Sequence, residues 1–292
     1  MQFLAYIVIY PLLWIISILP FRLLYLLSDG LYVLLYHVIG YRKKVVTSNL
    51  KLVFPIKNEK EIAIIRKKFY KHLSDMFLEM AKTMTISKKS LDKRFKLKNP
   101  HELKRLEALN KSIILMYAHY ASWEWSIAIQ NHISFLGLGV YKKLANTYFD
   151  KLARAIRSKF NTKLINTKEA INVINEYELK GKKSVIAFIS DQSPRLTNEV
   201  YWGNFMGINI PCFTGAERLA KKLDLTIAYL KITKVKRGHY VGEIMTLAEN
   251  PKAHEDYELT DLFLREVEKQ IYEAPEFYFW THKRWKHKDK NN

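Results

Sequence analysis

The first twenty positions of the chain are largely apolar and contain no charged side chain. Residues 3–19 read FLAYIVIYPLLWIISIL, which just meets the short limit of about 17 residues for a helix that crosses a bilayer. Pro11 lies mid-run, where a helix inside a bilayer tolerates proline better than an isolated soluble helix does. Tyr6, Tyr10 and Trp14 add amphipathic rings of the kind found near membrane interfaces. The pattern therefore predicts an N-terminal membrane-anchoring helix.

A cleaved signal peptide and a buried core helix are the two alternatives to an anchor. A signal peptide begins with a positive segment and ends in small residues, whereas this run starts uncharged and ends in Leu19-Pro20-Phe21-Arg22, which excludes it. The buried core helix stays open. Arg22 and the run Arg42-Lys43-Lys44 follow the apolar segment, and because positive flanks stay in the cytoplasm, we expect the body of the protein to face the cytosol.

A second apolar stretch, residues 23–40, is interrupted by Asp29-Gly30. The charge and the glycine argue against a second clean span, so we expect a broken helix that lies in the membrane interface or packs on the body. The predicted organisation is an anchor and interfacial helix at 1–40, followed by one globular domain at 41–292.

The globular part shows two kinds of periodicity. In the first part, apolar residues recur at three- and four-residue intervals, which predicts an amphipathic helix. The residues of its apolar side are Ile62, Ile65, Phe69, Leu73 and Phe77. From about residue 93, short apolar runs alternate with amphipathic helices. This alternation predicts a layered α/β domain, with a largely parallel or mixed sheet flanked by helices. Strands are expected at 111–119, 136–143, 184–190, 225–235 and 238–247, the last two as a hairpin, and helices at 122–133, 146–160, 215–223 and 256–274.

The charge balance adds a question about partners. The 292 residues include 48 Lys and Arg against 28 Asp and Glu, a formal net charge of +20. Nucleic acid, an anionic membrane surface and acidic or phosphorylated molecules could each account for it, and composition cannot choose among them. Cys212 is the only cysteine, which excludes an intramolecular disulfide and a multi-cysteine metal site and suits a reducing compartment.

Candidate chemistry lies in the segment AHYASWEW. A predicted strand ends at Ala118, His119 follows in the turn, and Ser122 is a suitable N-cap for the helix after it. Glu124 falls in the first helical turn, where its carboxylate could fold back toward the imidazole. A histidine oriented by a carboxylate can remove a proton from a hydroxyl. Taken alone the spacing is weak, and a solvated or structural histidine explains it better.

Five further segments put this histidine in context. Together with HYASWEW they follow one another in a fixed order, and the six are RKKVVTSNLKLVFP (42–55), HYASWEW (119–125), VYKKLANTYFD (140–150) with Arg157 beyond it, SDQSPR (190–195), FTGAERLA (213–220) and APEFYFWTHKRWK (274–286). With the N-terminal anchor they resemble the lipid A late acyltransferase family, enzymes that add secondary acyl chains to a lipopolysaccharide precursor. The resemblance extends over nearly the whole chain.

The resemblance implies a glycerolipid-acyltransferase-like fold and a lauroyl or myristoyl transferase type of activity. An acyl chain would pass from a thioester on acyl carrier protein to the hydroxyl of a 3-hydroxyacyl chain on the lipid A precursor. His119 would act as the general base and Glu124 would hold its imidazole. The resemblance implies no metal, no cofactor and no covalent enzyme intermediate.

It also implies a substrate site and a location. The residues expected at the substrate are Arg157, Asp191, Arg195, Arg218 and Arg284. The arginines are expected to bind phosphates of the glycolipid, and Asp191 is expected to be a supporting carboxylate. The implied partners are acyl carrier protein, the phosphorylated glycolipid acceptor and inner-membrane lipids. The implied location is the inner membrane, with one N-terminal anchor and the catalytic domain in the cytoplasm.

Two departures and two alternatives accompany the resemblance. Many relatives place a proline in the strand after the RLA helix, and here LTIAYLKI has none, which leaves the acyl-donor preference open. VYKK carries lysines where tyrosine-arginine is more usual. Nucleic-acid binding leaves the anchor and the histidine motif unexplained, so we do not favour it. A related acyltransferase acting on another glycolipid, a glycerophospholipid or an aminolipid stays open.

Overall fold

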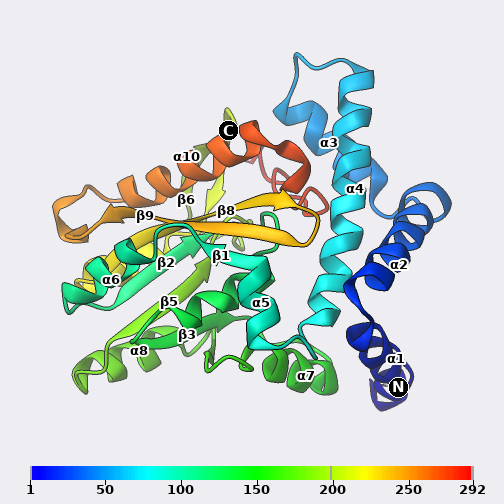
Figure 1. The fold of residues 1–292 in the computed structure, drawn as a ribbon. Coiled ribbons are helices and arrows are strands. Elements are labelled where there is room, and N and C mark those ends of the chain that lie inside the picture. The colour runs from blue at the N-terminus through cyan, green and yellow to red at the C-terminus, as the bar shows by residue number, and fades with distance from the viewer. Residues whose placement is uncertain (1, 198, 291–292) are drawn as a thin grey trace.

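The computed structural model describes residues 2–197 and 199–290, and a seven-stranded sheet lies at its centre (Figure 1). The strands follow the order β1-β9-β8-β2-β5-β3-β4 across the sheet. They are β1 Phe95–Leu97, β2 Ile113–Tyr117, β3 Leu136–Tyr141, β4 Lys163–Asn166, β5 Ser184–Ile189, β8 Thr226–Lys236 and β9 His239–Ala248. Neighbouring strands are parallel except β8 and β9, which form an antiparallel hairpin. The predicted α/β domain with a mixed sheet, and its hairpin, are confirmed.

Helices flank the sheet and extend beyond one side of it (Figure 1). The α-helices are α1 Gln2–Ile18, α2 Phe21–Val33, α3 Lys43–Val53, α4 Glu59–Lys82, α5 Lys88–Arg94, α6 Pro100–Ala108, α7 Thr147–Arg157, α8 Ala170–Leu179, α9 Gly215–Leu223 and α10 Glu258–Glu273. The π-helical turn η1 Leu34–Val38 continues α2, and the 3₁₀ helices are η2 Trp123–Asn131, η3 Pro251–Ala253 and η4 Pro275–Phe277. Strands β6 Tyr201–Phe205 and β7 Ile208–Cys212 form a separate hairpin. Of the four helices predicted after residue 93, the one at 122–133 differs, because it is 3₁₀ rather than α-helical.

Strand β2 lies in the middle of the sheet, between β5 and β8. All five of its residues are buried, as expected for a parallel strand whose two faces are both covered by other layers. Its continuous apolar run therefore sets the position of everything that follows it in the chain, including His119.

Helix α4 stands between the sheet and the two N-terminal helices α1 and α2 (Figure 1). Its predicted apolar stripe packs against the body of the protein, with Phe77 half-buried and the other residues buried. Helix α1 also reaches α7, where the rings of Phe3 and Tyr6 contact that of Tyr148. The N-terminal helices are thus packed on the domain along one side only.

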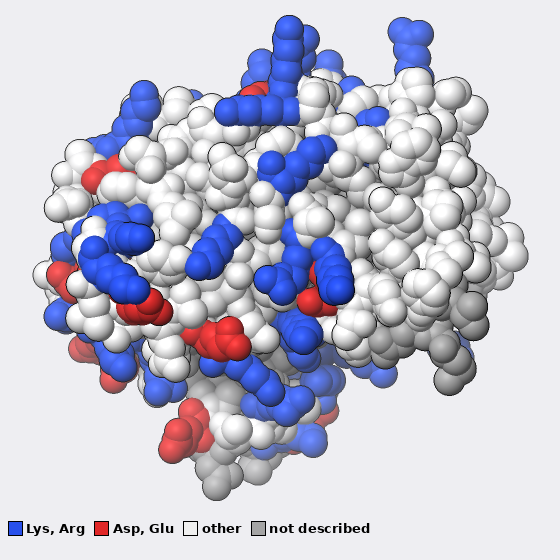
Figure 2. Space-filling view, turned by 90° about the horizontal axis from the view of Figure 1, so that it is seen from below, with Lys and Arg blue, Asp and Glu red and all other residues white. Residues whose placement is uncertain are grey.

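The outward side of these helices is apolar. In Figure 2, the side of the molecule that carries α1 shows a broad area without Lys, Arg, Asp or Glu. No single described helix is both long and apolar enough to cross a bilayer. The segments Phe21–Val38 and Lys43–Val53, with a bend of 85° between them, reach the necessary length and apolar composition only when they are taken together. The exposed apolar side chains are Phe3, Ile7, Val8, Ile9, Leu12, Trp14, Ile15 and Ile18 of α1, and Leu23, Leu26, Leu27, Val33, Leu34 and Val38 of α2 and η1.

The predicted break at Asp29-Gly30 is wrong, because α2 runs through both residues without interruption. The charge that argued for a break is neutralised across the fold, since Arg237 Nη2 donates to Asp29 Oδ1 at 2.7 Å. The chain turns later, at Gly40, where φ is +65° and a residue without a side chain is favoured.

Charged residues of α4 lie on its buried side, which the helical pattern did not predict. Glu79 is fully buried and accepts hydrogen bonds from the hydroxyls of Tyr25 at 2.9 Å, Tyr240 at 2.8 Å and Ser122 at 3.2 Å. These donors come from α2, from β9 and from the turn after His119. One carboxylate therefore joins three separate parts of the fold.

Burial raises the pKa of Glu79 to about 7 in the native state, although the charge of Lys234 acts in the opposite direction. A glutamate in the unfolded chain titrates near pH 4.3, about its ordinary value, so the native state holds this proton more tightly. The stability contributed by protonated Glu79 is thus fully present below the unfolded pKa and is lost as the pH rises through the folded pKa.

We therefore predict that the free energy of unfolding of the wild type, measured relative to Glu79→Gln, falls by about 3 kcal/mol between pH 4.5 and 7. Urea denaturation in detergent micelles at a series of pH values measures it. Glu255→Gln, which removes an exposed carboxylate, is the control. A difference between wild type and Glu79→Gln that stays constant with pH would contradict the prediction.

Candidate active site

His119 and Asp191 meet at the carboxyl ends of two neighbouring parallel strands. The register of β2 and β5 pairs Tyr117 with Ile189, and each of the two polar residues follows two positions later. His119 Nδ1 lies 2.7 Å from Asp191 Oδ1. Because the carboxylate can only accept, Nδ1 carries the proton in neutral His119, and Nε2 is left as the basic nitrogen.

The turn that carries His119 is held by the C-terminal segment. Ala121 has a φ of +50°, and its N–H donates to Phe277 O at 2.9 Å. Phe279 N–H donates to His119 O at 3.1 Å. The rings of Phe279 and Trp123 lie 6.0 Å and 5.1 Å from the imidazole, on which the first is stacked and the second is edge-on. Backbone and rings together fix the orientation of the histidine.

Asp191 is only 1% exposed, yet it stays ionised. Burial acts to raise its pKa, but the charge and hydrogen bonds of His119 and the charge of Arg284 outweigh burial and hold the pKa below its usual value. Gln192 Nε2 lies 3.4 Å from His119 Nδ1 and 3.2 Å from His119 Nε2, so the amide lies beside the ring, close to both nitrogens. The imidazole therefore has an anion in contact with Nδ1 and a neutral amide next to the ring.

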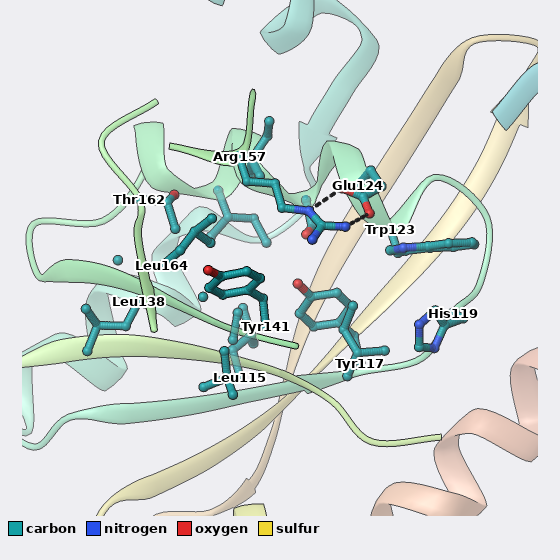
Figure 3. Close-up of a pocket in the computed structure, with 18 of the residues that line it drawn as sticks. Leu115, Tyr117, His119, Trp123, Glu124, Leu138, Tyr141, Arg157, Thr162 and Leu164 are labelled. Carbon is teal, nitrogen blue, oxygen red and sulfur yellow. Dashed lines mark hydrogen bonds and ion pairs between the residues drawn. The ribbon is translucent and has the colours of Figure 1, made fainter. Parts of the chain in front are cut away.

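Glu124 does not hold the imidazole, and this part of the prediction is wrong. Its carboxylate faces α7 and forms a two-pronged ion pair with Arg157, with Oε2 at 3.0 Å from Nε and Oε1 on Nη2 (Figure 3). The local reason is the start of η2. Ser122 makes no capping bond and donates to Glu79 instead, so Trp123 begins a 3₁₀ helix rather than the predicted α-helical turn.

A cavity of about 580 Å³ begins at His119 and Trp123 and extends past the Glu124–Arg157 pair toward Leu138 and Leu164 (Figure 3). It lies between η2 and the strands β2, β5 and β3, and most of its walls are apolar. The strand side chains Leu115 and Tyr117 line it next to the histidine.

Two glycines of β3 leave room in this wall. A Cβ on Gly137 would lie 1.6 Å from Gln130 Oε1, and a Cβ on Gly139 would lie 2.9 Å from Leu164 Cδ2. A side chain at either position would therefore push one of these neighbours, both of which line the cavity.

Four arginines were predicted to bind phosphate, and the structure does not gather them. Arg157 is held by Glu124 in the cavity wall, while Arg195 and Arg218 are exposed. Arg284 is 1% exposed, and its Nη1 donates to Pro211 O at 2.9 Å and to Ser193 Oγ at 3.3 Å. The prediction for Arg284 is wrong, because its guanidinium is enclosed by protein and satisfies a buried carbonyl. Asp191 was expected as a supporting carboxylate, and the group it contacts is His119; its contact with the substrate stays a prediction.

Two residues of the motifs were left without a role by the sequence. Gln192, in SDQSPR, lies against the imidazole. Asn49, in the basic motif of α3, donates at 2.9 Å to the backbone oxygens of both Trp280 and His282. The signal for Gln192 was its place directly after Asp191 at a strand end. For Asn49 no local signal existed, because its partners lie far along the chain.

Comparison with known proteins gives relatives over the whole fold. The model of the family described as bacterial lipid A biosynthesis acyltransferase matches residues 1–287. The lipid A biosynthesis lauroyltransferase of Escherichia coli K12 is 26% identical over 275 residues, which cover 94% of this chain and 89% of the relative. The lipid A biosynthesis palmitoleoyltransferase of the same strain is 20% identical over 276 residues, covering 94% and 88%. The lipid A biosynthesis acyltransferase of Shigella flexneri gives the same values.

The position of Arg284 yields a stability prediction. Arg284→Met leaves the buried carbonyl of Pro211 without its donor, so we expect it to lower the free energy of unfolding by about 2 kcal/mol or more. The matched control is Lys283→Met next to it, an exposed site where we expect a change within about 0.5 kcal/mol. Thermal unfolding of both variants decides. A stable Arg284→Met protein with impaired substrate binding would restore the arginine to the substrate site.

Proposed function

Because the chain belongs to the bacterial lipid A biosynthesis acyltransferase family and is an acyltransferase, we propose the following reaction for it. A fatty acyl chain passes from the thioester of acyl carrier protein to the hydroxyl of a 3-hydroxyacyl chain on a lipid A precursor. The observation that carries this proposal is the His119–Asp191 pair at one end of an apolar cavity.

His119 acts as the general base in this proposal. Its Nε2 accepts the proton of the acceptor hydroxyl, and Asp191 stabilises the imidazolium through Nδ1. The acceptor oxygen then attacks the thioester carbonyl carbon, a new ester bond forms and the C–S bond breaks. The proton on His119 passes to the departing thiolate, which restores the neutral imidazole.

Arg157 supplies positive charge in the cavity wall, and Glu124 is the residue that positions it. The negative charge that develops on the thioester oxygen is stabilised most by a preorganised cation in a site that excludes water. Glu124 thus contributes to catalysis through the arginine and not through the histidine. This assignment keeps both residues of the predicted motif at the site, with a different division of work.

The acceptor and the membrane occupy the outside of the site. Arg195 and Arg218 bind phosphates of the acceptor in this proposal. Both are exposed and follow Gln192 and Phe213, two residues that line the cavity, and this supports the assignment. The exposed apolar side of α1, α2 and η1 lies in the cytosolic leaflet of the inner membrane, with the sheet on the cytoplasmic side.

The test of the function is a deletion strain of the source bacterium, complemented with wild type, His119→Ala or Asp191→Asn. We expect the deletion to remove one acyl chain from lipid A, and only the wild type to restore it fully. In an acyl-transfer assay, each variant should lower turnover by about a hundredfold or more, since a general base contributes on that scale. Lipid mass spectrometry and the assay are the measurements.

Two results would contradict the proposal. Full turnover by a well-folded His119→Ala protein would remove the base. Unchanged lipid A together with an altered aminolipid, glycerophospholipid or other glycolipid would assign the enzyme to the alternative acceptor classes.

The cavity wall yields a prediction about the preference between acyl donors of different length. Gly139→Val pushes Leu164 into the cavity. We therefore expect kcat/KM for a shorter acyl donor, divided by kcat/KM for a longer one, to rise about tenfold. Leu164→Ala enlarges the same region and should shift the ratio toward longer donors. Competition between acyl donors of different length measures both. An unchanged donor profile in both variants would place the acyl chain elsewhere.

A further inference from the structure

A second concave surface lies along helix α3. It has a volume of about 1110 Å³ and is bounded by the loop before α3, the first half of α4 and the end of the chain. Its charged lining residues are all basic, and they are Arg42, Lys43, Lys44, Lys51, Arg66 and Lys288. We call this surface the basic groove.

Most of this positive charge is not compensated by the protein. Lys51 pairs with Glu59 and Lys288 with Asp289, but no described carboxylate forms an ion pair with Arg42, Lys43, Lys44 or Arg66. Like charges gathered at one place repel one another and destabilise the folded state. Their presence around a concavity therefore favours an anionic ligand.

The cations are also held in position. Lys43 Nζ lies 4.1 Å from the centre of the Tyr36 ring. Arg66 Nη1 donates to Thr47 Oγ1 at 2.7 Å, and Arg42 Nη1 donates to Thr281 O at 2.9 Å. A guanidinium that is fixed in this way can add further donors to a bound phosphate with little loss of freedom.

The first turn of helix α3 lines the same groove. The N-terminal end of a helix of 11 residues carries partial positive charge, which favours phosphate. The Thr47 hydroxyl is already used within the protein, because it donates to Lys43 O at 2.8 Å and accepts from Arg66. The positive end of the helix and the basic side chains therefore meet at one place.

The chain just before the groove is apolar and exposed. Val38 is 71% exposed and Ile39 60%, and Gly40 next to them lines the groove. A ligand that matched both surfaces would carry an anionic phosphate and long apolar chains. A membrane phospholipid has this chemistry, whereas an acidic protein needs a larger and flatter surface, typically about 800 Å² per partner.

We propose that the basic groove binds the phosphate headgroup of an anionic membrane phospholipid, whose acyl chains run over the exposed side chains of η1. The inference rests on the proposed seating of α1, α2 and η1 in the membrane. It adds a preference among lipids that apolar contact alone does not give, and it fixes the rotation of the domain against the bilayer.

The experiment uses the full-length protein and two kinds of vesicle, one of phosphatidylcholine alone and one with phosphatidylglycerol added. The groove variant is Lys44→Glu/Lys51→Glu, at two exposed sites. The control variant is Lys168→Glu/Lys182→Glu, which makes the same change in net charge at the two ends of α8, far from α3 (Figure 1). Flotation at one ionic strength gives the partition coefficient of each protein.

We expect the wild type and the control to prefer the anionic vesicles, and the groove variant to lose about tenfold or more of that preference. Its binding to neutral vesicles should not change. Lys44→Gln/Lys51→Gln, a milder change, should show a smaller loss in the same direction, which guards against a folding defect of the first variant.

Other outcomes are distinct. A wild type that binds neither kind of vesicle overturns the proposed membrane seating. A wild type that binds both equally, or a control that loses as much preference as the groove variant, overturns the basic groove alone. The groove variant could also keep its lipid preference and show a raised KM for acyl carrier protein. This result would mean that the basic groove binds that acidic protein, and it would also overturn the proposal.

Discussion

The parallel pairing of β2 with β5 is the constraint on which the site depends. It makes the residues two positions past each strand neighbours, and those residues are His119 and Asp191. A shift of the register by one residue would turn every side chain of one strand to the opposite face. It would send the wall residues Leu115 and Tyr117 into the other layer, so the same pairing fixes both the dyad and its cavity.

The pairing alone does not fix the turn that carries the histidine. That turn has a positive φ at Ala121, and it forms backbone hydrogen bonds with Phe277 and Phe279. The next residue, Ser122, donates a hydrogen bond to the buried carboxylate of Glu79. Because Ser122 is used in this way it does not cap the following helix, and Glu124 is free to pair with Arg157. The position of each group therefore follows from a contact made by its neighbour.

These contacts separate what the sequence could predict from what it could not. The buried strands, the hairpin and the position of His119 at a strand end can be recognised from neighbouring residues in the sequence, and all three occur in the structure. Glu124 was chosen as the partner because it is near in sequence, whereas Asp191 lies 72 residues from the histidine. Arg284 looked like a surface cation for the same reason, since nothing local shows that Pro211 O lies in front of it. Spacing along the chain carries no information on contacts made by folding.

Helix α2 shows why the helical pattern did not predict the buried carboxylates of α4. It exposes leucines, with Leu26 69% exposed, and turns the hydroxyls of Tyr25 and Ser28 inward to Glu79 and Asp75. In a water-soluble domain this arrangement would be reversed, because a helix normally keeps its polar side in solvent. Burying carboxylates costs free energy unless donors surround them, and the inward hydroxyls of α2 supply those donors. The polar side of α4 is thus the partner of a helix whose own outer surface is suited to lipid.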